Sequence, residues 1–308
     1  MTPIRIGLEY FTPWTNDVGY QIAIANDLYL QQGLEVRQVL VDPLAGDTLE
    51  HLVRGEVDIA VCPTNRLLKR VEAGQALRGI ATINHRAMET ILTTTSTGIQ
   101  RPLDLQGRRV AFNPTPRGIA LVRHLITSDG GDPDSMIIVD SGSREINADD
   151  IVAGFADAFF GAYWAWDALF GTTPSAQRVA LPVDEIGMLA YPSYVLAVRA
   201  DSLPTDRESL TKFLHASEQG FRLAASDHAL AVDVAVRCVP YVKPELIAHS
   251  LNILPATWFD EHGQWGNHPW TKHRAYAQWL AQHGVLQDAS VVEMTLIDDL
   301  FDAVSESA

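Results

Sequence analysis

The chain has 308 residues, of which 47% are apolar and 20% are charged, proportions typical of a soluble globular protein. This length accommodates two lobes of ordinary size or one large domain. The net charge of −15 argues against nucleic acid or an anionic membrane as a partner, because phosphate groups attract basic proteins. The simplest meaning of the charge is solubility.

The chain carries few signals of compartment. Two cysteines, Cys62 and Cys238, are too few for a disulfide framework or a cysteine-based metal site. No apolar run approaches the roughly 20 residues that a membrane helix needs. The opening "MTPIRIGLEY" enters a strand pattern directly, without the features of a signal peptide. We expect either a cytosolic protein or one whose leader was removed, so localisation stays unassigned.

Hydrophobic periodicity predicts alternating strands and helices in the first two thirds of the chain and mainly helices after residue 199. The predicted strands are 3–8, 36–41, 57–62, 78–84, 90–95, 108–113, 136–140, 156–161, 178–181 and 193–199. The predicted helices are 18–32, 46–54, 64–73, 116–128, 147–153, 164–169, 206–226, 228–236, 243–253 and 269–283. This alternation is typical of a parallel sheet with helices on both faces.

Two stretches of the chain resemble each other at a constant offset. "HLVRGEVDIAVCPTN" (51–65) and "DIVAGFADAFFGAYW" (150–164) both place a glycine three residues before an aspartate and a buried strand. The same offset relates Gly19 to Gly118. This pattern indicates duplicated halves; chance similarity between two strand–helix–strand units is the alternative. The expected lobes are 1–92 with 197–308, and 93–196, joined through strands.

Ligands of open α/β sheets bind beyond the carboxyl ends of the strands. Four loops lie there, "EYFTPWTND", "PTNR", "NPTPRG" and "AYWAWD", and two facing lobes would bring them to one cleft. Aromatic rings from opposing loops could stack on both faces of a flat ligand, although ordinary core packing is an equal alternative for each ring. The candidate rings are Tyr10, Trp14, Tyr163 and Trp166, while Phe11 and Trp164 are better candidates for the core.

Polar residues in these loops could orient such a ring. Asn16 offers donors and an acceptor, and Glu9 and Asp167 could accept from an exocyclic amine. Thr115 and Arg117 open a helix, where an anion is favoured, although a plain N-cap explains Thr115 equally well. The remaining candidates are Asn65, Asn113, Glu185 and Tyr191.

No motif of a hydrolase, nucleotide-binding loop, zinc protease or redox dithiol occurs, so we expect neither catalysis nor a metal or other cofactor. Ten histidines are scattered, and those in "HGQWGNHPWTKH" (262–273) are too widely spaced for a zinc site. Cys62 ends a strand with no neighbouring histidine, which favours a buried structural thiol.

The segments "IGLEYFTPWTNDVGYQIA", "GEVDIAV", "LQGRRVAFNPTPRG", "GAYWAWD" and Gln264–Trp270 resemble the NMT1/THI5-like substrate-binding proteins. The resemblance covers about residues 1–285. It implies a two-lobed type II periplasmic-binding-protein fold, with a ligand cleft between the lobes. By position, the pyrimidine-binding set of the family corresponds to Tyr10, Asn16, Tyr163, Trp166 and Asp167, with Trp14 inserted in the first loop.

The resemblance implies a monomer that binds an aminopyrimidine precursor of thiamine and delivers it to an ABC-transporter permease at the periplasm or cell surface. A related pyrimidine synthase needs a lysine, a histidine and a cysteine cluster, where this chain has Cys62, Arg66 and "GMLAYPSY". That departure argues against the synthase. A cytosolic enzyme or sensor on the same scaffold is the alternative.

Overall fold

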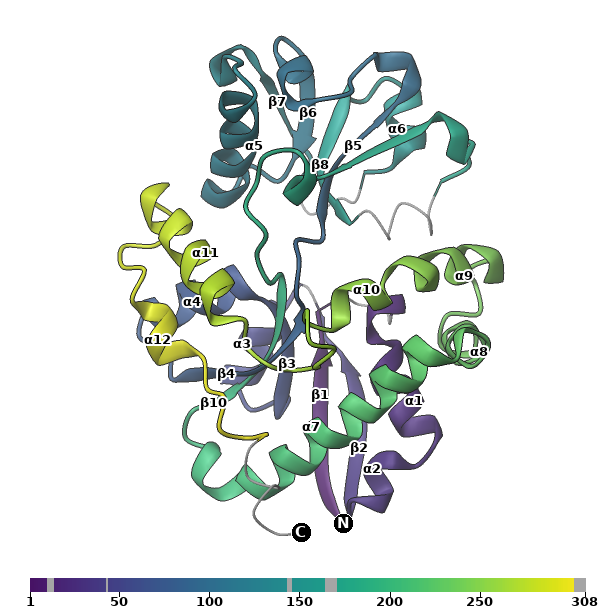
Figure 1. Ribbon diagram of the computed structural model, residues 1–308, viewed down its shortest axis with the longest axis vertical. Helices are drawn as coiled ribbons and strands as arrows, with labels where there is room; N and C mark the ends of the chain where they lie inside the picture. Colours follow the sequence, from purple (N-terminus) through teal and green to yellow (C-terminus); the bar gives the residue numbers. More distant parts are fainter. Residues whose placement is uncertain (10–13, 43, 143–145, 164–170, 302–308) are drawn as a thin grey trace. The chain divides into compact units, whose positions relative to one another are not determined.

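The structure is a computed structural model that describes residues 1–9, 14–42, 44–142, 146–163 and 171–301. Packing divides the chain into two compact units, shown in Figure 1. The first unit comprises 1–85, 192–278 and 286–308, and the second comprises 86–191 and 279–285. The lobe boundaries expected from the sequence, 1–92 with 197–308 and 93–196, stay a prediction. Within the described residues, no helix is both long and apolar enough to cross a membrane.

The first unit is built on a five-stranded sheet in the order β2-β1-β3-β10-β4. Strands β1, β2 and β3 are parallel, and β10 runs antiparallel between β3 and β4. The strands are β1 (Thr2–Leu8), β2 (Leu34–Leu40), β3 (Ile59–Pro63), β4 (Leu77–Asn84) and β10 (Tyr194–Arg199). Because β10 is reversed, its beginning lies at the same sheet edge as the carboxyl ends of the other four strands.

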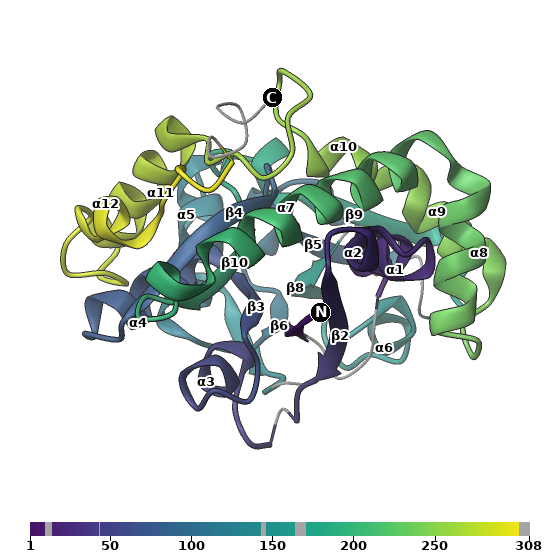
Figure 2. The ribbon, with the colours of Figure 1, turned by 90° about the horizontal axis from the view of Figure 1, so that it is seen from below.

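Helices cover both faces of this sheet (Figure 2). One face carries α1 (Val18–Ala25), α2 (Leu28–Gln31) and the 24-residue α7 (Leu203–Ser226), whereas α3 (Thr48–Val53) and α4 (Thr64–Glu72) pack on the other. Both faces of the strands are therefore apolar, and residues such as Ile6, Leu8 and Ala60 are fully buried. The unit is completed by α8 (His228–Cys238), α9 (Pro244–Ile253), α10 (Pro255–Trp258), α11 (Trp270–Gln282) and α12 (Val291–Thr295).

The outer side of the edge strand β4, with His85 directly after it, is paired with segments from the C-terminal third of the chain. The amide nitrogens of Thr82 and His85 donate to the carbonyls of Gly266 and Thr257, at 2.8 and 2.7 Å. The Ile297 amide donates to the Gly79 carbonyl at 3.0 Å. These bonds satisfy backbone groups that an open edge would offer to another chain.

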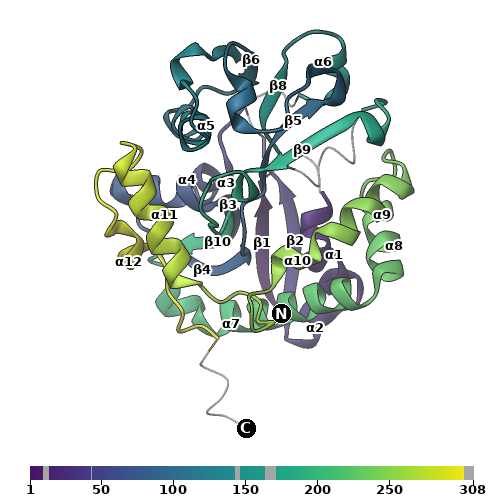
Figure 3. The same ribbon diagram turned by 45° about the horizontal axis from the view of Figure 1, so that its top comes forward.

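The second unit repeats this arrangement in the sheet β7-β6-β8-β5-β9. Here β6, β7 and β8 are parallel and β5 is the reversed strand. The elements are β5 (Glu89–Thr94), β6 (Arg109–Phe112), β7 (Ile137–Asp140), β8 (Ala158–Tyr163), β9 (Arg178–Pro182), α5 (Pro116–Ser128) and α6 (Ala148–Val152). Figure 3 shows α5 and α6 on opposite sides of this sheet.

The two units share a detail that explains the glycine–aspartate repeat. The Asp58 carboxylate accepts from the Arg5 amide, and the Asp58 amide donates to the Arg5 carbonyl, at 2.8 Å in both cases. The Arg5 guanidinium also donates to the Gly55 carbonyl. Asp157, Arg109 and Gly154 make the same contacts, and both glycines have positive φ, 73° and 81°. The two units thus share their strand order and this set of contacts among an aspartate, an arginine and a glycine, which we call the latch. Both features agree with the duplication predicted from the sequence.

One predicted helix is wrong in part. The helix expected over 18–32 is broken, because α1 ends at Ala25 and α2 starts at Leu28. Asp27 takes a left-handed conformation at φ 57°, which Asn and Asp tolerate better than other non-glycine residues, and the Asn26 side chain donates to the Ile22 carbonyl. The short α10 and α12 were not predicted, and the helix predicted over 164–169 lies outside the described residues.

Candidate functional site

The carboxyl edge of the first sheet holds a partly buried acid, Glu9, directly after β1. Its carboxylate accepts from Arg66 Nη1 at 2.6 Å and from Thr48 Oγ1 at 2.9 Å, and Arg66 also lies 3.4 Å from Asp47. Burial raises the pKa of Glu9, and the Arg66 charge partly opposes that rise. Glu9 was predicted to lie here; its partners Thr48 and Arg66 come from the first turns of α3 and α4 and were missed.

Asn16 lies in a buried hydrogen-bond network at the same edge. Its Oδ1 accepts from Asn84 Nδ2 at 2.9 Å and from Trp258 Nε1 at 2.8 Å, and its Nδ2 donates to Asn84 Oδ1 at 3.0 Å. Asn84, the last residue of β4, also donates to Thr257 Oγ1 at 2.8 Å. Most of the hydrogen-bonding capacity of Asn16 is therefore used within the protein, which leaves one amide hydrogen for another partner.

Asp17 follows in the turn between β1 and α1 and is 1% exposed. Burial raises its pKa to about 7, opposed by a hydrogen bond from the Trp14 backbone amide at 3.2 Å, while the charge of Glu9 adds to the rise. Trp14 itself is 4% exposed. The first unit thus places two carboxyl groups with raised pKa values, Glu9 and Asp17, after the same strand.

The carboxyl edge of the second sheet holds a three-residue cluster of Arg117, Glu89 and Tyr191. Arg117 Nη2 donates to Glu89 Oε1 at 2.7 Å and lies 2.8 Å from the Tyr191 hydroxyl, which in turn donates to Glu89 Oε2. The guanidinium also stands over the Tyr191 ring, 5.6 Å from its centroid. Glu89 pairs with Tyr163 across β5 and β8, so the cluster lies beside the end of β8.

The other predicted residues of this edge have local roles in the structure. Thr115 is the N-cap of α5, since its hydroxyl accepts from the Gly118 amide at 3.1 Å. Asn113 is exposed, and so is Glu185, whose carboxylate pairs with Arg86 at 2.9 Å. The Arg86 guanidinium also donates two hydrogen bonds to the Asp184 carboxylate, at 2.9 and 2.7 Å. Asn65 is half-buried in the first turn of α4.

Several predicted contacts fall outside what the structure describes. Tyr10, Trp166 and Asp167 lie outside the described residues, together with Phe11 and Trp164. Tyr163 is described only as the backbone at the end of β8. The prediction that aromatic rings sandwich a flat ligand therefore stays a prediction.

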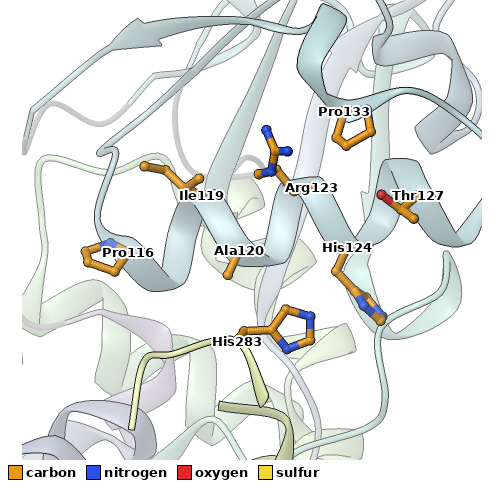
Figure 4. A pocket seen from close by; sticks show the side chains of 8 residues that line it. All are labelled: Pro116, Ile119, Ala120, Arg123, His124, Thr127, Pro133 and His283. Carbon is orange, nitrogen blue, oxygen red and sulfur yellow. The ribbon is translucent and has the colours of Figure 1, made fainter. Parts of the chain in front are cut away.

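The second unit also has an open hollow of about 420 Å³ against α5 (Figure 4). Six side chains of α5 line it, together with Pro133 and with His283, which follows α11. His124 and His283 meet edge to face at 5.5 Å, and Arg123 is paired with Asp134 at 2.7 Å. None of the residues predicted to bind ligand lines this hollow.

No three histidine, cysteine, aspartate or glutamate side chains of the described residues are placed to hold a metal ion. Cys62 is fully buried at the end of β3, where burial raises its thiol pKa well above the ordinary value. A protonated thiol without access to solvent is a poor nucleophile. Cys62 is therefore unsuited to act as a nucleophile in this structure.

Comparison with known proteins identifies the family of the chain. A family described as "NMT1/THI5 like" matches residues 14–229, which confirms the resemblance seen in the sequence. The formylaminopyrimidine-binding protein of Halalkalibacterium halodurans is 21% identical over 291 residues, covering 92% of this chain and 85% of that protein.

Solved structures share the whole fold at low identity. The alkanesulfonate-binding protein SsuA of Xanthomonas axonopodis pv. citri, bound to MOPS, has a TM-score of 0.71 at 17% identity and covers 97% of this chain and 99% of its own. The desulfurization enzyme DSZB has a TM-score of 0.67 at 11% identity, with 99% of each chain covered. The expected fold class, a two-lobed α/β binding-protein fold, is confirmed.

Proposed function

The chain belongs to the NMT1/THI5-like family, and from this premise we propose that it binds a small aromatic heterocycle, an aminopyrimidine of the thiamine-precursor type, without transforming it. The similarity to a formylaminopyrimidine-binding protein across 92% of the chain is the observation that carries the proposal. Delivery to an ABC-transporter permease and a monomeric state are parts of the same proposal.

The first unit supplies acids that suit such a ligand. An aminopyrimidine offers an exocyclic amine, which donates, and ring nitrogens, which accept. Asp17 has a pKa of about 7, so near neutral pH it can accept from the amine when ionised or donate to a ring nitrogen when protonated. Burial also raises the pKa of Glu9, whose carboxylate already accepts from Arg66 and Thr48. The free amide hydrogen of Asn16 would complete a donor–acceptor edge.

The second unit supplies a cluster that can meet the polar substituent of the ring. Arg117 and Tyr191 are already ordered by Glu89, so a ligand carbonyl or hydroxyl there encounters donors whose positions are set before binding. Preorganised donors lower the entropy that binding must overcome. Tyr10, Tyr163, Trp166 and Asp167, the aromatic and acidic set implied by the family, remain part of the proposed site.

A catalytic role is the second candidate, because the enzyme DSZB has this fold. The described residues give it little support: the Cys62 thiol is buried and protonated, and the positions where the pyrimidine synthase needs its reactive groups carry other side chains. Incubation with a candidate ligand followed by mass spectrometry tests this alternative. Recovery of unchanged ligand is expected; a new product would establish an enzyme.

A thermal-shift panel tests the proposed ligand class. Formylaminopyrimidine, thiamine and a flavin are each added to the protein over a range of concentrations. A ligand at about 100 times its Kd stabilises the folded state by about 2.7 kcal/mol, which raises the melting temperature by a few degrees. We expect formylaminopyrimidine to raise it most. Equal, negligible shifts for all three compounds would refute the proposed ligand class.

A further inference from the structure

Three histidines of the first unit are buried together beside the edge strand β4. His85 follows the strand and is 4% exposed, His268 is 6% exposed, and His273 in the first turn of α11 is fully buried. The hydroxyl of Thr82 on β4 joins two of them, at 2.8 Å from His268 Nδ1 and 3.0 Å from His273 Nε2. Because Thr82 has a single hydroxyl hydrogen, it can donate to only one of these two rings.

The direction follows from the carbonyl of Gly79, which can only accept. His268 Nε2 lies 3.3 Å from that oxygen, so the neutral ring carries its hydrogen on Nε2 and its Nδ1 accepts. The hydroxyl of Thr82 therefore donates to His268 Nδ1. His273 Nε2 must then carry a hydrogen and donate to the Thr82 oxygen, which leaves the His273 Nδ1 as a bare acceptor.

That acceptor is buried and has no hydrogen-bond partner among the described residues, and the same is true of both ring nitrogens of His85. A buried polar atom that is left unpaired destabilises the folded state. Lys272, the neighbour of His273 in the chain, places its Nζ 3.5 Å from the His85 carbonyl oxygen, which brings the first turn of α11 beside His85. A water molecule can satisfy such atoms when two to four polar groups surround it.

We propose that His85 and His273 enclose a binding site for a single buried water molecule, which donates to His273 Nδ1 and is held by the His85 ring. The water would complete a chain of hydrogen bonds from His85 through His273, Thr82 and His268 to the Gly79 carbonyl. Every member of this chain is neutral and has its hydrogen in a fixed place. Proton uptake by His273 would put a donor where the chain requires an acceptor.

The charged groups around these hydrogen-bonded histidines leave the network sensitive to protonation. Burial lowers the pKa values of His85 and His268 to about 4 and that of His273 well below its usual range. Asp260 favours charge on His85 and Asp298 favours it on His268, whereas Lys272 opposes charge on His85. Each folded-state pKa lies below the unfolded value of 6.5, so folding stability is lost as the pH falls through 6.5 toward about 4.

A double-mutant cycle with His85→Phe and His273→Phe tests the water site, read as urea midpoints at neutral pH. If the water bridges the rings, His85→Phe lowers the midpoint, and the double variant loses less than the sum of the two single losses. If the ring nitrogens are unbridged, replacing His85 by phenylalanine removes unpaired polar atoms and raises the midpoint. A raised midpoint, or additive losses, would overturn the proposal.

The same variants test the pH response. Between about pH 7 and pH 5 the midpoint of His85→Phe should fall less than that of the natural protein, while His249→Gln, at an exposed histidine of α9, should follow the natural protein. Should the variants fail to fold, nitrogen-15 NMR of the natural protein decides instead. We expect His268 and His273 to carry their hydrogens on Nε2 at neutral pH; a hydrogen on His273 Nδ1 would overturn the proposal.

Discussion

At the scale of single residues, Asp17 is a carboxyl group held where water does not reach it. It is 1% exposed, its pKa is raised to about 7, and Trp14 provides one backbone hydrogen bond. An acid whose folded-state pKa exceeds its unfolded value favours folding only while it is protonated. Folding stability from this residue is therefore complete below about pH 4 and is lost as the pH rises through 7.

Asp17→Asn should consequently stabilise the protein in mildly alkaline solution. Asparagine keeps an oxygen for the Trp14 amide and removes the buried charge. Raising a pKa from 3.8 to about 7 costs up to about 4 kcal/mol at about pH 8, since one pKa unit corresponds to about 1.4 kcal/mol. Urea unfolding at about pH 8 and about pH 4 measures the difference. A gain equal at both pH values, or a loss at the higher one, would contradict this account of Asp17.

Asn16 could be identified as a candidate ligand contact from the sequence, but its hydrogen-bond partners within the protein could not. The sequence predicts a ligand contact for Asn16, which stays a prediction. The structure shows that Asn16 Oδ1 also accepts from Asn84 and Trp258 inside a buried network. These donors come from positions 68 and 242 residues away, and no local pattern predicts such pairings.

Asn16→Ala should therefore reduce stability as well as any binding. Removing the amide leaves the buried Asn84 and Trp258 donors unpaired, at about 1–3 kcal/mol each. Chemical unfolding of the variant without ligand measures this loss, with Asn65→Ala in the half-buried turn of α4 as the control. Unchanged stability for Asn16→Ala would show that the network carries no net stabilisation.

At the scale of secondary-structure elements, the strands could be predicted closely because buried strands are short apolar runs between turn residues. The break between α1 and α2 could not, because it depends on the left-handed Asp27. The partners of the site also escaped prediction. Glu89 reaches Arg117 and Tyr191 only because β5 is the reversed strand of its sheet, and the sequence does not state strand direction.

The contact between α1 and α7 depends on two glycines. A Cβ placed on Gly220 would lie 2.1 Å from the Gly19 carbonyl oxygen, and one placed on Gly19 would lie 2.3 Å from the Phe221 ring. The helix backbones approach too closely for any side chain. Gly220→Ala must separate the two helices and should cost at least about 3 kcal/mol. Gln219→Ala, at the neighbouring exposed position, should be nearly neutral. Melting temperatures of the two variants compare them, and equal values would refute the close approach.

The repeated latch allows a matched comparison between the two units. Asp58 accepts from the Arg5 backbone and twice from its guanidinium at 2.7–3.0 Å, whereas the guanidinium bond to Asp157 is 3.3 Å long. Asp58→Ala should therefore destabilise more than Asp157→Ala, by about 1–2 kcal/mol against about 1 kcal/mol, since both pairs are partly exposed. Urea unfolding measures both. A larger loss for Asp157→Ala than for Asp58→Ala would contradict this ranking.

At the scale of the whole molecule, two units with the same strand order each present polar side chains at the carboxyl edge of their sheet. The family and fold could be predicted from the sequence because both depend on motifs spread over most of the chain. The ligand could not, since a few side chains in the loops decide it, and several of those lie outside the described residues. The negative charge of −15 remains consistent with an uncharged or cationic ligand.

The central claim is that this protein binds an aminopyrimidine through these edges, and calorimetric titration with formylaminopyrimidine tests it most directly. We predict saturable binding to one site, weakened about tenfold or more by Arg117→Met. Arg123→Met, on the same helix and paired with Asp134, should bind as the natural protein does. The absence of any saturable heat at all ligand concentrations, with folding intact, would contradict the claim; equal affinity of Arg117→Met and Arg123→Met would remove Arg117 from the site.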